Sequence, residues 1–270
     1  MRKWQVITLT ILLFLIFLVA TAPAKLAYAV YKTRVAPDAP VMLGSVTGTI
    51  WSGRAAPALL GGQRVDSLSW ELRPWALLIG RIQAQVEFRY GDSYGAAEVA
   101  RGFTGKIYAK NIEARIDLQR MRLLAQVLPL GMEGSLLLNL KEFVLDRRSI
   151  VNAEGLLAWD GAVITVPQRT EFGNLRVAVS TDNEGVKATL SDGGGPLQAE
   201  GLFSVTREGN YKFTGVFSAR DQNQRMLTQG LQMLGRSSPD GKANIAVNGA
   251  LSQLFNFFEK AETPPTPVAQ

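Results

Sequence analysis

Apolar and polar side chains alternate along most of the chain after residue 44. In residues 82–90, the side chains of Ile82, Val86 and Tyr90 fall on one side, and Gln, Glu and Arg side chains fall on the other. The same period recurs in 68–72, 112–118, 175–179 and 211–213, and glycine-rich segments separate these stretches. A period of two is typical of a strand with one buried face, and such strands favour antiparallel hairpins over a parallel sheet. The pattern predicts a mainly β chain built as an antiparallel β-meander.

Residues 4–24 interrupt this pattern, because none of them is charged. As a helix the stretch is about 31 Å long, close to the roughly 30 Å hydrocarbon core of a bilayer. It predicts a transmembrane helix, and basic residues on both sides leave its orientation open. A signal peptide cleaved at 27–29 is the alternative, although the apolar run is longer than the usual signal core. The expected membrane-anchoring residues are Val6, Leu9, Ile11, Leu12, Leu13, Phe14, Leu15, Ile16, Phe17, Leu18 and Val19.

Helical spacing occurs in only a few segments. Residues 118–128 carry apolar side chains at helical spacing and stop at a proline. In 221–235, Asp221 is a candidate N-cap and Gly235 follows the expected end. Residues 252–262 are a third candidate. We therefore expect two or three short helices beside the strands.

Two glycine–tryptophan motifs resemble each other. GTIWSG runs from Gly48 to Gly53, and GLLAWDG occupies 155–161. The segments beginning QRM after each motif repeat at nearly the same offset, which favours an internally duplicated unit. In such a unit Trp51 and Trp159 would each anchor the packing between meander and helix. Chance similarity between β-rich segments is the alternative.

These patterns divide the chain into five parts. We expect an anchor with its flanks at 1–34 and a linker at 35–43. Two β-meander and helix halves follow at 44–131 and 132–251. A short helix and a disordered, Pro-rich tail occupy 252–270.

The segment 72–82, LRPWALLIGRI, is too apolar for an ordinary surface loop. Pro74 ends the strand that contains Trp70, and Trp75 opens the apolar run. The favoured interpretation is a short turn that covers the core. An exposed patch that contacts membrane or a partner is the alternative.

Composition narrows the chemistry. The chain has no cysteine and no histidine, which excludes thiolate chemistry, disulfides and histidine as a general base or metal ligand. The net charge is +6, but the basic residues are scattered and form no run, so we expect no nucleic-acid binding. The hydrophobic fraction of 47% is enough for a folded core.

The short motifs also argue against catalysis. GDSYG at 91–95 matches the G-x-S-x-G nucleophile elbow, yet the chain has no histidine to activate the serine. Its position between two strand patterns predicts a hairpin turn. GRSSPDGK at 235–242 lacks the spacing of a phosphate-binding loop. We expect a protein that is not an enzyme, with no cofactor and no metal.

The ordered motifs resemble those of a known family. After the apolar N-terminal stretch come VTGTIWSG, LSWELRPWALLIGRI, LPLGMEGSLLL, GLLAWDGAVITVP and LGRSSPDGKANIAVNGAL. This series resembles the type II secretion system protein N family (general secretion pathway protein N). The resemblance implies a single-pass protein of the bacterial inner membrane with its bulk in the periplasm. It also implies a role in the export of folded proteins, with inner-membrane platform subunits as partners and no catalytic residues.

A second resemblance leads to another function. Long meanders behind an N-terminal anchor are similar to AsmA-type proteins, whose grooves hold lipid. The alternative is therefore a lipid-binding or lipid-transfer protein. Under the favoured interpretation, Gly48, Trp51, Gly53, Trp70, Trp75 and Trp159 are structural or contact residues.

Overall fold

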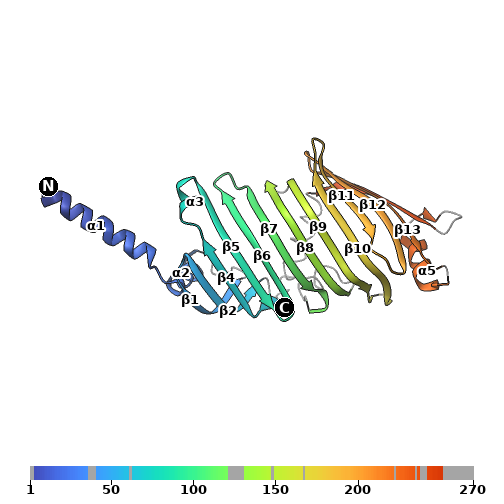
Figure 1. Ribbon diagram of the computed structural model, residues 1–270, viewed down its shortest axis with the longest axis horizontal. Coiled ribbons are helices and arrows are strands. Elements are labelled where there is room, and N and C mark those ends of the chain that lie inside the picture. Colours follow the sequence, from blue (N-terminus) through green and yellow to red (C-terminus); the bar gives the residue numbers. More distant parts are fainter. Residues whose placement is uncertain are drawn as a thin grey trace, which may run out of the picture. The chain divides into compact units, whose positions relative to one another are not determined.

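In a computed structural model, the described residues are 3–35, 41–60, 63–120, 131–146, 149–166, 168–221, 223–234, 236–237 and 242–251. Contacts divide the chain into two compact units, Met1–Gly91 (unit 1) and Asp92–Gln270 (unit 2). Both are dominated by antiparallel strands, with few short helices (Figure 1). The mainly β fold class predicted from the alternation is confirmed. The division into five parts stays a prediction.

Unit 1 begins with helices and continues as a small antiparallel sheet. Its strands are ordered β1-β2-β4-β5, and β3 pairs with β2. The elements are α1 (Lys3–Ala20), α2 (Ala24–Val30), a π-helical turn (Tyr31–Val35), β1 (Val41–Gly48), β2 (Ser52–Leu60), β3 (Gln63–Val65), β4 (Ser67–Leu72), α3 (Trp75–Leu78) and β5 (Arg81–Tyr90).

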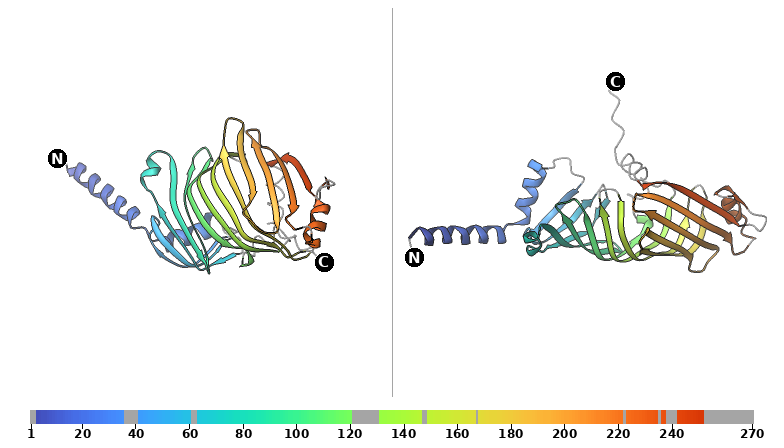
Figure 2. Two further views of the ribbon diagram at one scale, coloured as in Figure 1. Left: turned by 45° about the vertical axis from the view of Figure 1, so that its right-hand side comes forward. Right: turned by 90° about the horizontal axis from the view of Figure 1, so that it is seen from above.

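α1 is apolar on all sides and buries none of its residues in the protein. Among the residues that the structure describes, it is the one helix long and apolar enough to cross a membrane, with a mean hydropathy of 2.1. A helix without a polar face has no soluble core to cover, so its surface fits a lipid environment. Figure 2 shows α2 leaving α1 at a steep angle in the right-hand view.

The core of unit 1 is small. Ala55, Ala58 and Val65 are buried at its centre, and the half-buried side chains of Leu43, Val46, Leu68, Trp70 and Tyr90 surround them. Small central residues allow the larger aromatic and branched side chains to close over them.

Unit 2 is an antiparallel meander of longer strands. The strand order is β6 to β13 in sequence, followed by β15 and β14. The elements are β6 (Ser93–Gly102), β7 (Ile107–Asp117), a 3₁₀ turn (Leu118–Arg120), β8 (Met132–Asp146), β9 (Ser149–Ile164), β10 (Thr170–Thr181), β11 (Gly185–Asp192), β12 (Leu197–Thr206), β13 (Asn210–Ala219), α5 (Arg225–Leu234), β14 (Arg236–Ser237) and β15 (Ala243–Ala250).

α5 covers part of one face of this sheet. Leu227 and Leu231 lie one helical turn apart and pack on the buried side chains of Leu197, Ala199 and Ala243. Their spacing places both on one side of the helix, while Gln229 between them is exposed. Helical spacing correctly predicted this element.

The predicted helix boundaries need correction. α5 begins at Arg225, so Asp221 is not its N-cap; the Asp221 carboxylate instead accepts the Asn223 N–H at 2.9 Å, in the turn before the helix. Of the predicted helix 118–128, the structure describes only the 3₁₀ turn at its start. The predicted helix 252–262, the tail and Gly235 lie outside the described residues.

The two glycine–tryptophan motifs have different structures. GTIWSG forms the end of the β1–β2 hairpin, where Gly48 pairs with Gly53. GLLAWDG instead lies within the continuous strand β9. The internal duplication is therefore not confirmed.

Candidate functional site

The end of the β1–β2 hairpin contacts the carboxyl-terminal end of α1. The Trp51 indole Nε1–H donates to the Val19 carbonyl oxygen at 2.9 Å, and the Ile50 N–H donates to the Ala22 oxygen at 3.0 Å. Thr49 also forms a β-bridge with Pro23. The last carbonyls of a helix lack partners within the helix, so this hairpin caps α1 and joins it to the sheet.

Two glycines allow the hairpin to close. Gly48 has a φ of +87°, a conformation that side chains disfavour. A Cβ atom on Gly53 would collide with the Trp70 ring and the Thr47 carbonyl. The Trp70 indole also donates to the Ile50 carbonyl oxygen at 3.2 Å. Trp70 therefore holds the hairpin end from the side of β4.

α2 covers part of the outer edge of β1. The Tyr28 hydroxyl accepts the Leu43 N–H at 2.9 Å and lies 3.4 Å from the Val41 carbonyl oxygen, to which it donates. An open strand edge invites pairing with another chain. Because Tyr28 occupies these backbone groups, strand addition is blocked at this part of β1. The sequence did not predict the role of Tyr28, because this role depends on where β1 lies in the fold and no local motif marks it.

The apolar segment after β4 is exposed. The exposed fractions are 78% for Trp75, 81% for Leu78 and 71% for Ile79, and only Ala76 in this turn is buried. The prediction of a core-covering turn was wrong. α3 has only four residues, about one helical turn, and buries the small Ala76 while its large side chains project outward.

Trp159 connects β8 and β9 at an irregular point of their ladder. The register shifts between Glu133 and Ser135, where Gly134 has a φ of +104°. The Trp159 indole N–H donates to the Glu133 carbonyl oxygen at 2.9 Å. The indole thereby supplies a partner at the bulge, where the regular ladder is disrupted. The expected role of Trp159 beside the helix of its own half, α5, stays a prediction.

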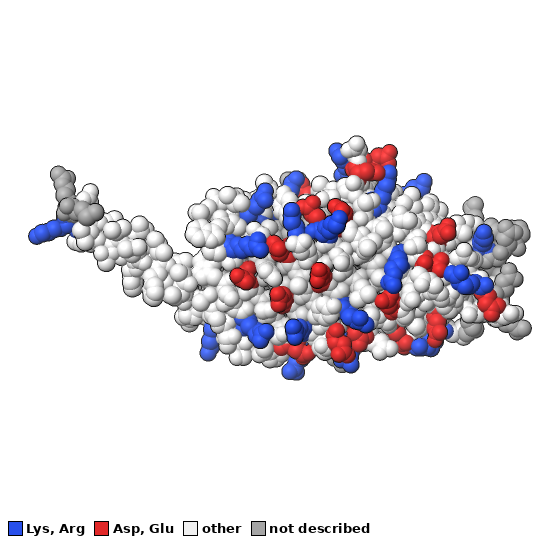
Figure 3. All heavy atoms as spheres, in the orientation of Figure 1, with Lys and Arg blue, Asp and Glu red and all other residues white. Residues whose placement is uncertain are grey.

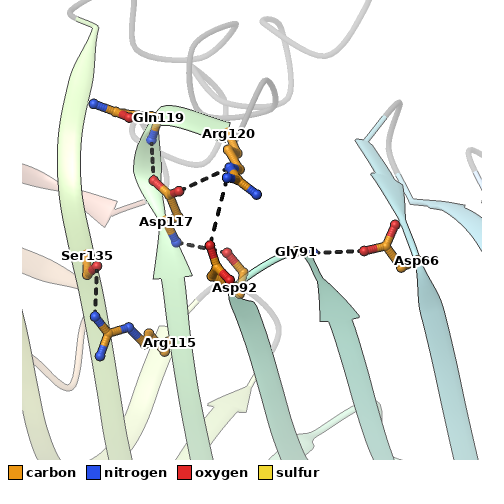
Figure 4. Close-up of polar contacts among 9 residues, drawn as sticks. Asp66, Gly91, Asp92, Arg115, Asp117, Gln119, Arg120 and Ser135 are labelled. Carbon is orange, nitrogen blue, oxygen red and sulfur yellow. Dashed lines mark hydrogen bonds and ion pairs between the residues drawn. The ribbon is translucent and has the colours of Figure 1, made fainter.

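The serine of GDSYG has a structural position. Ser93 is 1% exposed, and its Oγ accepts the Asp117 N–H at 2.9 Å. The Asp117 carboxylate in turn accepts the Gln119 N–H and pairs with Arg120 at 3.3 Å (Figure 4). A buried hydroxyl committed to a backbone amide does not have the exposure of a nucleophile elbow.

In unit 1, the Asp66 carboxylate accepts the Gly91 N–H at 2.8 Å, also shown in Figure 4. Gly91 has a φ of +54° and begins the predicted turn. The carboxylate therefore fixes the turn that GDSYG was predicted to form.

Many charged groups pair across strands or within turns, and Glu184, Lys187 and Lys212 line a shallow hollow on β11 to β13. Among the described residues, no group of three acidic side chains is placed to hold a metal ion. The Lys187 ammonium hydrogen-bonds Asp182 and Glu184, which raises the pKa of Lys187 and lowers the pKa of Asp182. These contacts stabilise the β10–β11 turn.

One face of unit 2 carries an exposed apolar surface. Tyr94, Leu137, Leu156 and Ala158 lie around a shallow hollow on β6 to β9 and form what we call the Leu156 surface. Leu156 is 60% and Tyr94 is 52% exposed. The alternation Glu154, Leu156, Ala158, Asp160 could have revealed this surface, because an exposed apolar residue there interrupts a polar face.

Paired charges border the Leu156 surface. Arg176 binds Asp160 at 2.6 Å on one side, and Lys141 binds Glu154 at 2.8 Å on the other. Figure 3 shows acidic and basic side chains interleaved over the visible face of the protein. Glu113 and Asn139 also line the hollow, so the Leu156 surface combines apolar and polar side chains, as protein contact sites commonly do.

Comparisons with known proteins identify the family. The model of the family "Type II secretion system (T2SS), protein N" matches residues 39–246. The chain is 26% identical to the type II secretion system protein N of Aeromonas hydrophila, over 93% of this chain and 99% of that protein. It is 23% identical to the protein of that name from Pectobacterium carotovorum subsp. carotovorum, over 89% and 94% of the two chains.

A protein of the same name from Vibrio cholerae serotype O1 is 27% identical, over 76% of this chain and 82% of that one. No solved structure matches the chain. The comparisons give no support to the AsmA-like alternative. The chain therefore belongs to the type II secretion system protein N family.

Proposed function

We propose that this chain is an accessory component of the type II secretion system at the bacterial inner membrane. α1 spans the membrane, the strands of both units lie in the periplasm, and the protein acts by contact with platform subunits and not by catalysis. Family membership supports the role in type II secretion. The uniformly apolar, unburied surface of α1 supports the membrane location.

The Leu156 surface is the observation that carries the contact mechanism. Its large side chains are exposed on a strand face that otherwise carries polar residues, and two charged pairs beside it, Lys141 with Glu154 and Arg176 with Asp160, are already formed. A partner can therefore bury Leu156 and Tyr94 without leaving Arg176 or Lys141 unpaired. Burying a charge without a partner would cost much more than the apolar contact contributes.

Apolar docking fits this protein better than strand addition at β1. Tyr28 occupies backbone groups at Val41 and Leu43 on the outer edge of that strand. A partner strand would have to displace the Tyr28 hydroxyl before it could pair there. We therefore assign the contact with platform subunits to the sheet face of unit 2.

Site-specific photo-crosslinking tests this proposal in cells with an intact secretion system. A photoreactive amino acid replaces Leu156 in the full chain, and a matched chain carries it at Glu200, an exposed polar position on β12. We expect platform subunits to cross-link at Leu156 and much less at Glu200. Leu156→Asp should lower secretion while the protein stays folded in the membrane. The absence of every secretion subunit among the products at Leu156 would contradict the contact mechanism.

A further inference from the structure

The exposed apolar turn of unit 1 has no cover among the described residues. Trp75, Leu77, Leu78, Ile79 and Ile82 form this α3 patch, and each is between 45% and 81% exposed. In Figure 3 the α3 turn carries no charged side chain on the visible side. A contiguous apolar patch of this kind marks a contact with a membrane or a partner.

The backbone places the α3 patch close to the end of α1. The Leu72 N–H at the end of β4 donates to the Trp51 carbonyl oxygen at 2.6 Å. The indole of the same Trp51 bonds to Val19 in the last turn of α1. Trp75 follows Leu72 by three residues, so its Cα lies within about 11 Å of the Leu72 Cα. Figures 1 and 2 show α1 and α3 at the same end of unit 1.

α2 exposes further apolar side chains beside the same hairpin. Its inner side holds buried Ala24 and the Tyr28 that bonds to β1, while Leu26 and Val30 are 63% and 58% exposed. α2 runs at a steep angle to α1 in the right-hand view of Figure 2. A short helix lying along a membrane surface that α1 crosses would have this direction.

We propose that the α3 patch, together with Leu26 and Val30, enters the interface of the bilayer that α1 spans. The inference rests on the membrane location proposed above. The occupant is lipid because the Trp51 bonds place the patch near the end of α1, whose apolar surface fits a lipid environment. Trp75 is also of a residue type favoured at membrane interfaces, where the indole N–H faces the headgroups and the apolar part of the ring contacts acyl chains.

The charge of the segment agrees with a lipid surface. Residues 72–86 contain no acidic residue, and they include the two basic residues Arg73 and Arg81. Basic residues at this depth favour anionic headgroups. Since α1 already holds unit 1 at the membrane, the patch meets lipid at a high effective concentration. Two contact points would fix the orientation of unit 1 on the membrane.

Fluorescence quenching in vesicles tests the inference on the full chain. The chain has no cysteine, so a single Leu78→Cys can carry an environment-sensitive fluorophore. The labelled protein is inserted into vesicles of phosphatidylethanolamine and phosphatidylglycerol that contain lipids spin-labelled near the headgroup. Ile11→Cys reports on the proposed span, and Leu156→Cys serves as an exposed apolar control in unit 2.

We expect blue-shifted emission and strong quenching at Leu78, with little of either at Leu156. Ile79→Glu should reduce the quenching at Leu78 and leave Ile11 within the bilayer. If Ile11 is within the bilayer and Leu78 behaves like Leu156, the inference is wrong. If Ile11 is not within the bilayer, the proposed membrane span itself fails.

Discussion

The Trp51 indole Nε1–H donates a hydrogen bond to the Val19 carbonyl oxygen across 2.9 Å, and so joins the β1–β2 hairpin to the end of α1. Residues 32 positions apart thereby link the apolar helix to the folded body. A second bond, from the Ile50 N–H to the Ala22 oxygen, restricts rotation between them. α1 and the strands of unit 1 should therefore move together and not as parts joined by a flexible linker.

Loss of the indole N–H should loosen this junction. In a chain with Ala22→Cys and Ile50→Cys, we expect efficient disulfide formation, because the backbones at these positions bond at 3.0 Å. Adding Trp51→Phe should lower the yield, since the ring remains but its donor is lost. Ala22→Cys with Arg64→Cys is the control, because Arg64 pairs with Leu59 at the far end of β2. Equal yields for both pairs would contradict a fixed junction.

The two hairpin glycines should resist substitution. Gly53→Ala places a Cβ against the Trp70 ring, and Gly48→Ala strains a φ of +87°. Each should lower the free energy of unfolding by about 1–3 kcal/mol, measured by denaturation in detergent. Gly230→Ala is the matched control, because no atom lies within 4 Å of its added Cβ. In helix α5 this control should be neutral or stabilising by up to about 1 kcal/mol.

Ser93→Ala should act on stability alone. It removes the acceptor of the Asp117 N–H and should cost about 1–3 kcal/mol of unfolding free energy. Ser180→Ala, at an exposed position on β10, should change the unfolding free energy by less than about 0.5 kcal/mol. Secretion that disappears in Ser93→Ala while stability stays unchanged would instead indicate that the hydroxyl has a chemical role.

The contact between α5 and the sheet should contribute strongly to the stability of unit 2. Leu231 is 5% exposed, and Leu231→Ala should destabilise the protein by about 2–5 kcal/mol. Gln229→Ala, two residues away on the exposed side, should have an effect within about 0.5 kcal/mol. Similar losses for both variants in thermal or chemical unfolding would show that α5 does not pack as described.

Acid should weaken the β10–β11 turn. The pKa of Asp182 is lowered in the folded state, chiefly by its hydrogen bond with Lys187. Its contribution is therefore present above the unfolded pKa of about 4 and lost as pH falls through the lower, folded pKa. Asp182→Asn should remove this part of the pH dependence, because the amide does not titrate. At neutral pH the variant should show faster amide exchange in the turn than the unchanged chain. Both groups are exposed, so we expect a small effect.

Periodicity predicted the strands well because the alternation of apolar and polar side chains is a property of each segment by itself. Residues 82–90 became β5, and the leucines one turn apart in 221–235 became the buried side of α5. The composition of 4–24 likewise indicated α1 without knowledge of any partner.

Features that depend on two distant segments could not be predicted in this way. Trp51 was expected to anchor a helix later in the chain, yet it bonds to Val19. Trp75 was expected to cover the core, because sequence gives the length of a turn but not the surface it faces. Tyr28 has a role only because β1 folds beside α2.

The topology in intact cells most directly tests the central claim, which is a β protein anchored by α1 with its strands in the periplasm. Cells that carry Thr189→Cys, at an exposed position on β11, are treated with a membrane-impermeant maleimide after the outer membrane is opened. A parallel strain that carries Lys3→Cys is treated in the same way. We predict labelling at Thr189 but not at Lys3, with the full-length chain retained in the membrane after carbonate extraction. A shortened chain in the soluble fraction, or labelling at Thr189 only after the inner membrane is broken, would contradict the account.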